Sequence, residues 1–190
     1  MDVLLSTKAK KLFDEYIRTN EDIYNLKDHI VELEKLAEKI VKKFPELDKE
    51  ILLLAIYLHD IGYYPLNLDE DHAITSERIA QKFLESEKYL KEKKVNVLQA
   101  IRSHRCKDVL PETLEAKAFA FMDSASHLTD KMYVEMVKQG KGKKALEKLE
   151  RDYRDLAIFP EIKQEMELLY LSWKSLILNL TKFEQEGFGK

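Results

Sequence analysis

The chain has 190 residues, 45% hydrophobic and 35% charged, with 32 basic residues, 35 acidic residues and a formal net charge of -3. This length suits one domain with a substantial core, and the hydrophobic fraction excludes a disordered chain. Because charges of both signs are mixed along the chain, the composition disfavours nucleic acid as a partner.

Cysteine content and the length of the apolar runs bear on location. The single Cys106 excludes an intrachain disulfide and fits a reducing compartment. No stretch approaches the roughly 20 apolar residues needed to cross a bilayer. The first residues, MDVLLSTKAKK, have too short an apolar run for a signal peptide. We therefore expect a cytoplasmic protein without a membrane partner.

The composition predicts an all-α fold, because glycine and proline are sparse while Leu, Lys, Glu, Ala and Ile dominate. Apolar residues at helical spacing predict a compact bundle of roughly seven to eight helices. In chain order these helices lie near residues 5–17, 26–40, 48–60, 72–84, 95–105, 112–139, 143–157 and 161–182. Asp48 is the expected N-cap of the third helix, and Gly62 is its expected stop, followed by the loop YYPLNLDED.

No internal repeat or low-complexity segment divides the chain, so we expect one domain over residues 1–190. GKGKK, at residues 140–144, resembles a fragment of a phosphate-binding loop. It lacks the Gly-x4-Gly-Lys-Ser/Thr spacing and the preceding strand, so we interpret it as a linker between helices.

The histidines and two aspartates fall on the inward sides of the predicted helices. His29 precedes Leu33 by one turn, and His104 follows Ile101 on an apolar face. His59 and Asp60 stand together at the end of a helix, about 100° apart around its axis. The remaining candidates begin the fourth helix or lie along the inner face of the long one: His72, Asp123 and, one turn after Asp123, His127.

Each of these residues has a purely structural interpretation when taken alone. A single histidine on an apolar face is more often a hydrogen-bonded core residue than a ligand. Together, however, they direct imidazoles and carboxylates inward from five helices, and a cation would resolve the cost of burying them. Such a donor set suits Zn, Fe, Mn, Ni or Co, and the absence of thiolates disfavours a closed structural zinc site.

The order and spacing of these residues resemble the HD-domain superfamily of metal-dependent phosphohydrolases. The resemblance is carried by His29, by LHDIG with His59 and Asp60, and by FAFMDSASHL with Asp123. DHAITSERIAQKFL and VLQAIRSHR resemble the intervening family helices. The resemblance covers roughly residues 20–130. Residues 143–182 are expected to form helices that pack on this core.

The resemblance implies a metal centre of one or two ions. One ion would be held by His29, His59, Asp60 and Asp123. Asp60 would bridge to a second ion held by His72 and His104. The implied reaction is hydrolysis of a phosphate ester or anhydride, on a small nucleotide-like substrate, by a water activated by the metal.

A cationic side chain should meet the phosphate, because arginine presents a fork of donors that matches its oxygens. Arg105, next to His104, is the best-placed candidate, and Arg102 and Arg78 are alternatives. Each of them could equally be a surface residue. Ser76 and Ser126 could bind phosphate or only hydrogen-bond within their own helices. His127 could support the site, act as a general acid or be a packed core histidine.

The alternative from another class is a non-catalytic module that senses a metal or nucleotide. The apolar pattern of residues 161–180, with Trp173, would then be a docking or homodimer face, although such a stripe more often completes a domain's own core. The complete set of six ligand candidates favours the enzyme.

Overall fold

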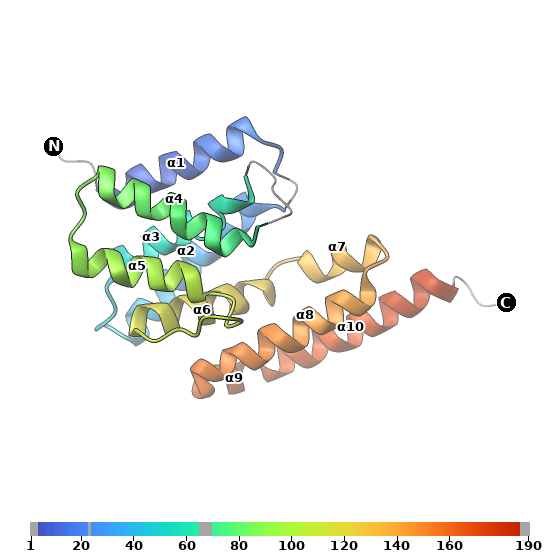
Figure 1. Ribbon diagram of the computed structural model, residues 1–190. Helices are drawn as coiled ribbons and strands as arrows, with labels where there is room; N and C mark the ends of the chain where they lie inside the picture. Colours follow the sequence, from blue (N-terminus) through green and yellow to red (C-terminus); the bar gives the residue numbers. More distant parts are fainter. Residues whose placement is uncertain (1–3, 23, 65–69, 187–190) are drawn as a thin grey trace. The chain divides into compact units, whose positions relative to one another are not determined.

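The computed structural model describes residues 4–22, 24–64 and 70–186 (Figure 1). Within these ranges the regular structure is helical and contains no strand, which confirms the all-α prediction. The ten α-helices exceed the predicted seven to eight. They are α1 (Leu5–Thr19), α2 (Leu26–Lys43), α3 (Lys49–Leu58), α4 (His72–Ser86), α5 (Lys91–Ser103), α6 (Leu114–His127), α7 (Met132–Lys138), α8 (Gly142–Asp155), α9 (Pro160–Glu165) and α10 (Glu167–Glu186), with 3-10 turns η1 (Ile61–Tyr63) and η2 (Leu156–Ile158).

The chain forms two compact units, and the boundary between Met122 and Asp123 lies within α6. Each unit is described by itself. Among the described helices, none combines the length and the apolar content that a bilayer crossing requires.

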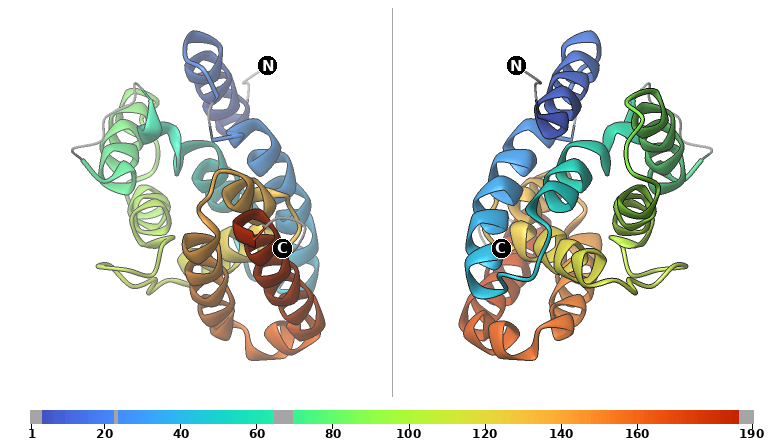
Figure 2. Two further views of the ribbon diagram at one scale, coloured as in Figure 1. Left: turned by 90° about the vertical axis from the view of Figure 1, so that its right-hand side faces the viewer. Right: turned by 90° about the vertical axis from the view of Figure 1, so that its left-hand side faces the viewer.

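Helix α3 is the centre of the first unit. It contacts α1, α2, α4 and α5, and Figure 2 shows it between these two pairs of helices. Its sequence explains this position, because a helix that is apolar all round must be buried on most sides. Seven of its ten residues are buried: Ile51, Leu52, Leu54, Ala55, Ile56, Tyr57 and Leu58. The predicted N-cap is confirmed, since the Asp48 carboxylate accepts hydrogen bonds from the backbone N–H groups of Glu50 and Ile51.

Gly62 has a different role from the predicted one. The α-helix ends earlier, at Leu58, and the chain continues through Asp60 into η1. Gly62 lies within this 3-10 turn and packs against the first turn of α4. An added Cβ would fall against the carbonyl oxygen of His72 and lie 2.5 Å from the backbone nitrogen of Ser76. Glycine is therefore needed for a close approach of two backbones. Of the loop that follows, residues 65–69 lie outside the described residues.

The single helix predicted over residues 112–139 is wrong, because the structure divides it into α6 and α7. At the break, the N–H groups of Leu128 and Thr129 bond to carbonyls three residues back, which tightens the last turn. The Thr129 hydroxyl donates to the Ser126 carbonyl, and the Asp130 carboxylate accepts from the N–H of Met132, the first residue of α7. Short polar side chains thus compete with the helix for its own backbone groups.

In the second unit, α8 and α10 pack antiparallel and both contact α7 (Figure 1). The linker predicted at residues 140–144 is confirmed only for its first two residues: Gly140, at φ +73°, and Lys141 lie between α7 and α8, whereas residues 142–144 form the first turn of α8. The Trp173 indole donates a 2.7 Å hydrogen bond to the Leu128 carbonyl and packs edge-on against Tyr133. The helix predicted over residues 161–182 is divided at Met166 into α9 and α10.

Candidate metal centre

Three elements of the first unit bring side chains to the end of α3. His59 is the C-cap of α3, Asp60 follows it, and His29 comes from the first half of α2. The Nε2 atoms of His29 and His59 lie 3.2 Å apart, and His59 Nε2 lies 3.3 Å from Asp60 Oδ2. All three residues are buried. Two imidazoles, one from α2 and one from the end of α3, thus meet a carboxylate at one point.

A second group forms around the other oxygen of Asp60. His72, the first residue of α4, places Nε2 3.2 Å from Asp60 Oδ1, and Nε2 of His104, the C-cap of α5, lies 3.8 Å from the same oxygen. Asp60 is only 9% exposed, and its buried Oδ1 makes no hydrogen bond to the described residues. A buried carboxylate oxygen without a hydrogen bond is costly unless a cation compensates it.

The candidate Asp123 is the residue that directly follows the first unit, on the unbroken helix α6. One ligand atom each of His29, His59 and Asp123 lies within 4.8 Å of the others, and the same holds for Asp60, His72 and His104. These are two clusters of histidine and aspartate that could hold metal ions. All six predicted ligands therefore fall into two adjoining groups.

Hydrogen bonds fix the orientation of two imidazoles. The Nδ1 atoms of His59 and His104 donate to the carbonyls of Ile56 and Ile101, at 3.0 Å and 2.7 Å. In a neutral ring this places the lone pair on Nε2, the atom nearest Asp60. A carbonyl that orients the far nitrogen of an imidazole is the usual outer support of a metal-binding histidine. The local fold therefore presents both rings in the tautomer that a metal needs.

Aromatic rings line the same region. The Phe119 ring packs edge-on against His59 at 5.1 Å and against His104 at 6.3 Å between centroids. The Tyr63 ring stacks on His72 at 4.0 Å, with an interplanar angle of 13°. These contacts restrict the rotamers of the imidazoles and provide an apolar wall that strengthens electrostatic interactions beside it.

The charge state of Asp60 follows from its neighbours. Burial by itself would raise the pKa of Asp60, but the neighbouring His59 and His72 outweigh burial and hold it well below its ordinary value. The carboxylate therefore stays ionised at neutral pH, which is the form that binds a cation. The donor set, imidazoles and carboxylates without thiolates, fits Zn, Fe, Mn, Ni or Co.

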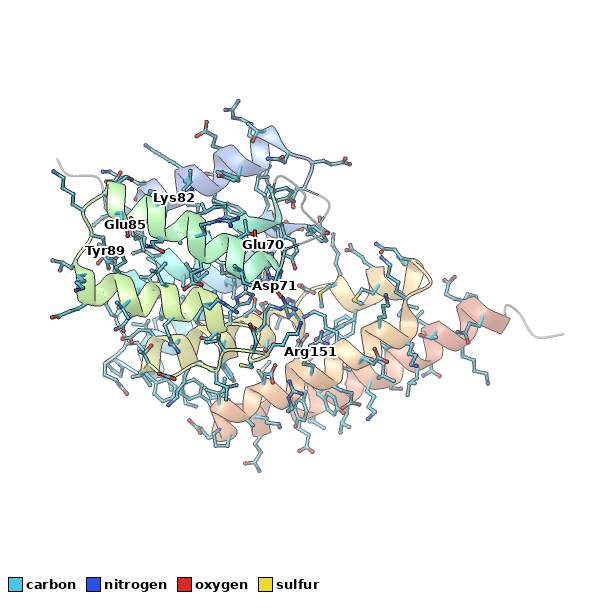
Figure 3. The ribbon with its side chains drawn as sticks, viewed as in Figure 1. Glu70, Asp71, Lys82, Glu85, Tyr89 and Arg151 are labelled. Carbon is cyan, nitrogen blue, oxygen red and sulfur yellow. The ribbon has the colours of Figure 1, made fainter. Side chains whose placement is uncertain are left out.

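All three candidate arginines are engaged with carboxylates. Arg105 pairs through Nη1 with Asp71, Arg78 pairs with Glu70, and Arg102 pairs with Asp108 (Figure 3 labels Asp71 and Glu70). Arg105 adjoins His104 in the chain, and its guanidinium reaches the residue before His72. Arg105 is thus connected to His72 through Asp71, the N-cap residue of α4, whereas Arg78 and Arg102 pair with other carboxylates.

Sequence reasoning missed Asp71. Its carboxylate accepts from the Ala73 N–H at 3.0 Å and so caps α4, it pairs with Arg105, and it lies 3.9 Å from His72 Nδ1. The available signal was its place directly before His72 at the predicted start of a helix, which is an N-cap position.

The other polar candidates make structural contacts. The Ser76 hydroxyl accepts from the Gly62 N–H at 2.9 Å, and the Ser126 hydroxyl donates to the Asp123 carbonyl at 2.7 Å. His127 lies in the second unit, where its Nδ1 is 3.3 Å from an oxygen of the buried Asp152. Asp152 also accepts a 2.7 Å hydrogen bond from the Tyr133 hydroxyl. His127 therefore belongs to a buried polar network of the second unit.

Comparison with known families agrees with this geometry. The model of the HD domain matches residues 26–128, which is more than half of the chain and includes all six ligand candidates. The match confirms the predicted family and the type of helical bundle. Searches of the curated proteins and of the solved structures gave no significant match.

Proposed function

Because this chain belongs to the HD-domain family, we propose that it is a metal-dependent phosphohydrolase that cleaves a phosphate ester or anhydride. The observation that carries the proposal is the buried Asp60 carboxylate. Its Oδ2 faces His59 at 3.3 Å, whereas its Oδ1 faces His72 at 3.2 Å and has no hydrogen bond to the described residues. This arrangement supports a carboxylate shared between two groups of ligands.

The proposed ligands are divided as the two oxygens of Asp60 suggest. Asp60 would join His29, His59 and Asp123 around one ion, and His72 with His104 around a second. When bound, a divalent ion lowers the pKa of a water molecule and offsets negative charge on a phosphoryl group. The protein's own part is to hold the imidazoles with Nε2 inward, through the backbone carbonyls that their Nδ1 atoms bond.

Arg105 is proposed to bind the phosphate. A guanidinium has five N–H donors, and the ion pair with Asp71 uses Nη1. The Arg105 side chain is 34% exposed, so its remaining donors can meet a ligand that approaches from solvent. Asp71 would hold the arginine next to His72 before the substrate arrives.

The proposed substrate is a small nucleotide-like phosphate. The net charge of -3 gives no broad attraction to polyanions such as nucleic acids. A cytoplasmic location is part of the proposal, since a chain with one cysteine cannot form an intrachain disulfide.

The test begins with elemental analysis of protein purified without chelator, followed by reconstitution with Mn or Co. Hydrolysis is then measured on nucleotides, dinucleoside polyphosphates and a generic phosphodiester. We expect stoichiometric metal and turnover of at least one compound. Protein that holds only trace metal after reconstitution and shows no turnover would refute the proposal, and stoichiometric metal without turnover would favour the non-catalytic sensor.

Two variants, each with a control, separate metal binding from phosphate binding. Asp60→Asn should lose both metal and turnover, whereas Asp155→Asn should keep both. Asp155 is a matched control, because it is also 9% exposed but pairs with the neighbouring Arg154 in the second unit. Arg105→Ala should keep the metal and lower turnover by about 10²-fold or more. If Arg102→Ala, which removes the partner of Asp108, lowers turnover equally, the assignment of Arg105 is wrong.

A further inference from the structure

Helix α10 has an outward face that the second unit leaves uncovered. Its inward face is packed, since Ile177 is 1% exposed and the Trp173 indole bonds to Leu128. On the outward side, large apolar side chains are exposed to 42% or more: Leu168, Leu171, Leu176, Leu178 and Phe183. The apolar pattern of residues 161–180 thus serves the core with one face and has a second apolar face that faces solvent.

This outward face carries almost no charge. Between Glu167 and Lys182 the helix has one charged residue, Lys174, and that side chain pairs with Glu150 of α8 at 2.6 Å. The rest of the outward surface consists of leucines and small polar residues, Ser172, Ser175 and Asn179. In a chain with 35% charged residues, a solvated helix face would be expected to carry more charge.

Residues on one side of this face follow the same order of types from either end: a charged residue, a leucine and then a small residue. Glu167, Leu171, Ser175, Leu178 and Lys182 are exposed, and they succeed one another at intervals of three or four residues. Such intervals place them on one side of a helix. The ends carry opposite charges, the next positions are leucines, and the middle is a small residue that permits close approach of another backbone.

We propose that this face binds the same face of a second copy of the chain, with the two α10 helices antiparallel. The register is the one that pairs the opposite charges at the two ends. In it, each residue faces the residue of the second copy whose number, added to its own, gives 349. Each Leu171 then meets the second copy's Leu178, and each Glu167 meets the second copy's Lys182. The contact is isologous, so one two-fold axis near Ser175 closes the assembly as a dimer.

A shallow groove supports this register. It lies between α8 and α10, has a volume of about 300 Å³, and is lined by Lys143, Leu146, Leu178 and Lys182 among others. In the antiparallel dimer, Glu167 of the second copy approaches this groove and meets Lys143 as well as Lys182. A parallel pair would instead place like charges opposite each other, which is unfavourable. Charge complementarity therefore favours a second copy in the antiparallel direction.

The first test is sedimentation of the full chain from about 1 µM to about 500 µM, a range that covers weak association. We expect a reversible equilibrium between monomer and dimer. Glu167→Lys and Lys182→Glu should each weaken the dimer by at least tenfold, since each places like charges together. The double variant restores opposite charges and should restore the dimer. Glu92→Lys, the same change at an exposed position on α5 of the first unit, should have no effect.

The second test reads the register directly. In a Cys106→Ser background, the double variant Leu171→Cys, Leu178→Cys should form intermolecular disulfides under mild oxidation, whereas Leu90→Cys, which lies 67% exposed in the first unit, should not. Circular dichroism checks that each variant is folded. A chain that stays monomeric throughout, a dimer that the charge variants leave unchanged, or a double variant that fails to restore association would each overturn the proposal.

Discussion

Replacement of Gly62 by alanine tests how the structure positions His72. The added methyl group would meet the His72 carbonyl and the Ser76 nitrogen, which are backbone atoms and cannot rotate away. Overpacking of this kind costs about 1–3 kcal/mol. The variant would also strain the buried 2.9 Å hydrogen bond from the Gly62 N–H to the Ser76 hydroxyl, and loss of such a bond costs about 1–3 kcal/mol.

The structure can relax and relieve part of both costs, and alanine lowers the entropy of the unfolded chain, which favours the folded state. We therefore expect the free energy of unfolding to fall by about 2–3 kcal/mol. With a urea dependence of about 2 kcal/mol per M, the midpoint should fall by about 1 M. Because α4 must shift, His72 should also move away from Asp60, so calorimetry should show weaker binding of Co. Unfolding is followed by circular dichroism.

Two controls make the result specific. Gly140→Ala changes a glycine with no atom within 4 Å of the added Cβ, so it should cost only the strain of φ +73°, about 1 kcal/mol, and leave metal binding intact. Ser76→Ala combined with Gly62→Ala should not rescue stability, because the backbone contacts remain. If the free energy of unfolding of Gly62→Ala lies within about 0.5 kcal/mol of that of the parent protein, the close approach of η1 and α4 is not as described.

Three further predictions concern other parts of the molecule. Asp48→Ala should lower the free energy of unfolding by about 1 kcal/mol through loss of the α3 cap. Lys93→Ala, which leaves the cap and removes the ion pairs of Lys93 with Asp48 and Glu50, should cost less. Burial raises the pKa of Asp152, but His127 and its other partners outweigh burial and lower it below the ordinary 3.8. Its stabilising contribution is therefore present above about pH 4 and lost as pH falls further, so urea titrations of Asp152→Asn at pH 3 to 6 should show a weaker pH dependence. Trp173→Phe should cost about 1 kcal/mol in the same assay, because it removes the hydrogen bond to the Leu128 carbonyl, and a cost near zero would contradict that contact.

Local patterns in the chain were sufficient for much of the fold. The continuous apolar run before His59 indicates a helix that is buried all round, and α3 is that helix. Asp48 was recognisable as a cap because short-range capping depends on neighbours two or three residues away. The six ligand candidates were recognisable because they lie on inward faces or at the ends of predicted helices and because their order resembles that of the HD-domain family. The structure gathers them into two groups.

Other features depended on contacts that local sequence does not encode. The break between α6 and α7 arises from hydrogen bonds of Thr129 and Asp130, which a pattern of apolar residues does not register. Gly62 is required by the backbone of α4, 14 residues further along the chain. His127 acquired its partner from Asp152 on α8, two helices further along the chain.

The arginines also separate what the sequence predicts from what tertiary contacts decide. In the sequence Arg105 was preferred only for its place next to His104, with Arg102 and Arg78 as alternatives. Its pairing with Asp71 beside His72 appears only in the tertiary structure. The single-domain organisation, with the C-terminal helices packed on the core, stays a prediction. The sequence by itself determined which residues face inward, since helical periodicity is a local property. Which inward residues meet was decided by tertiary packing, because distant segments must be folded before their side chains can come into contact.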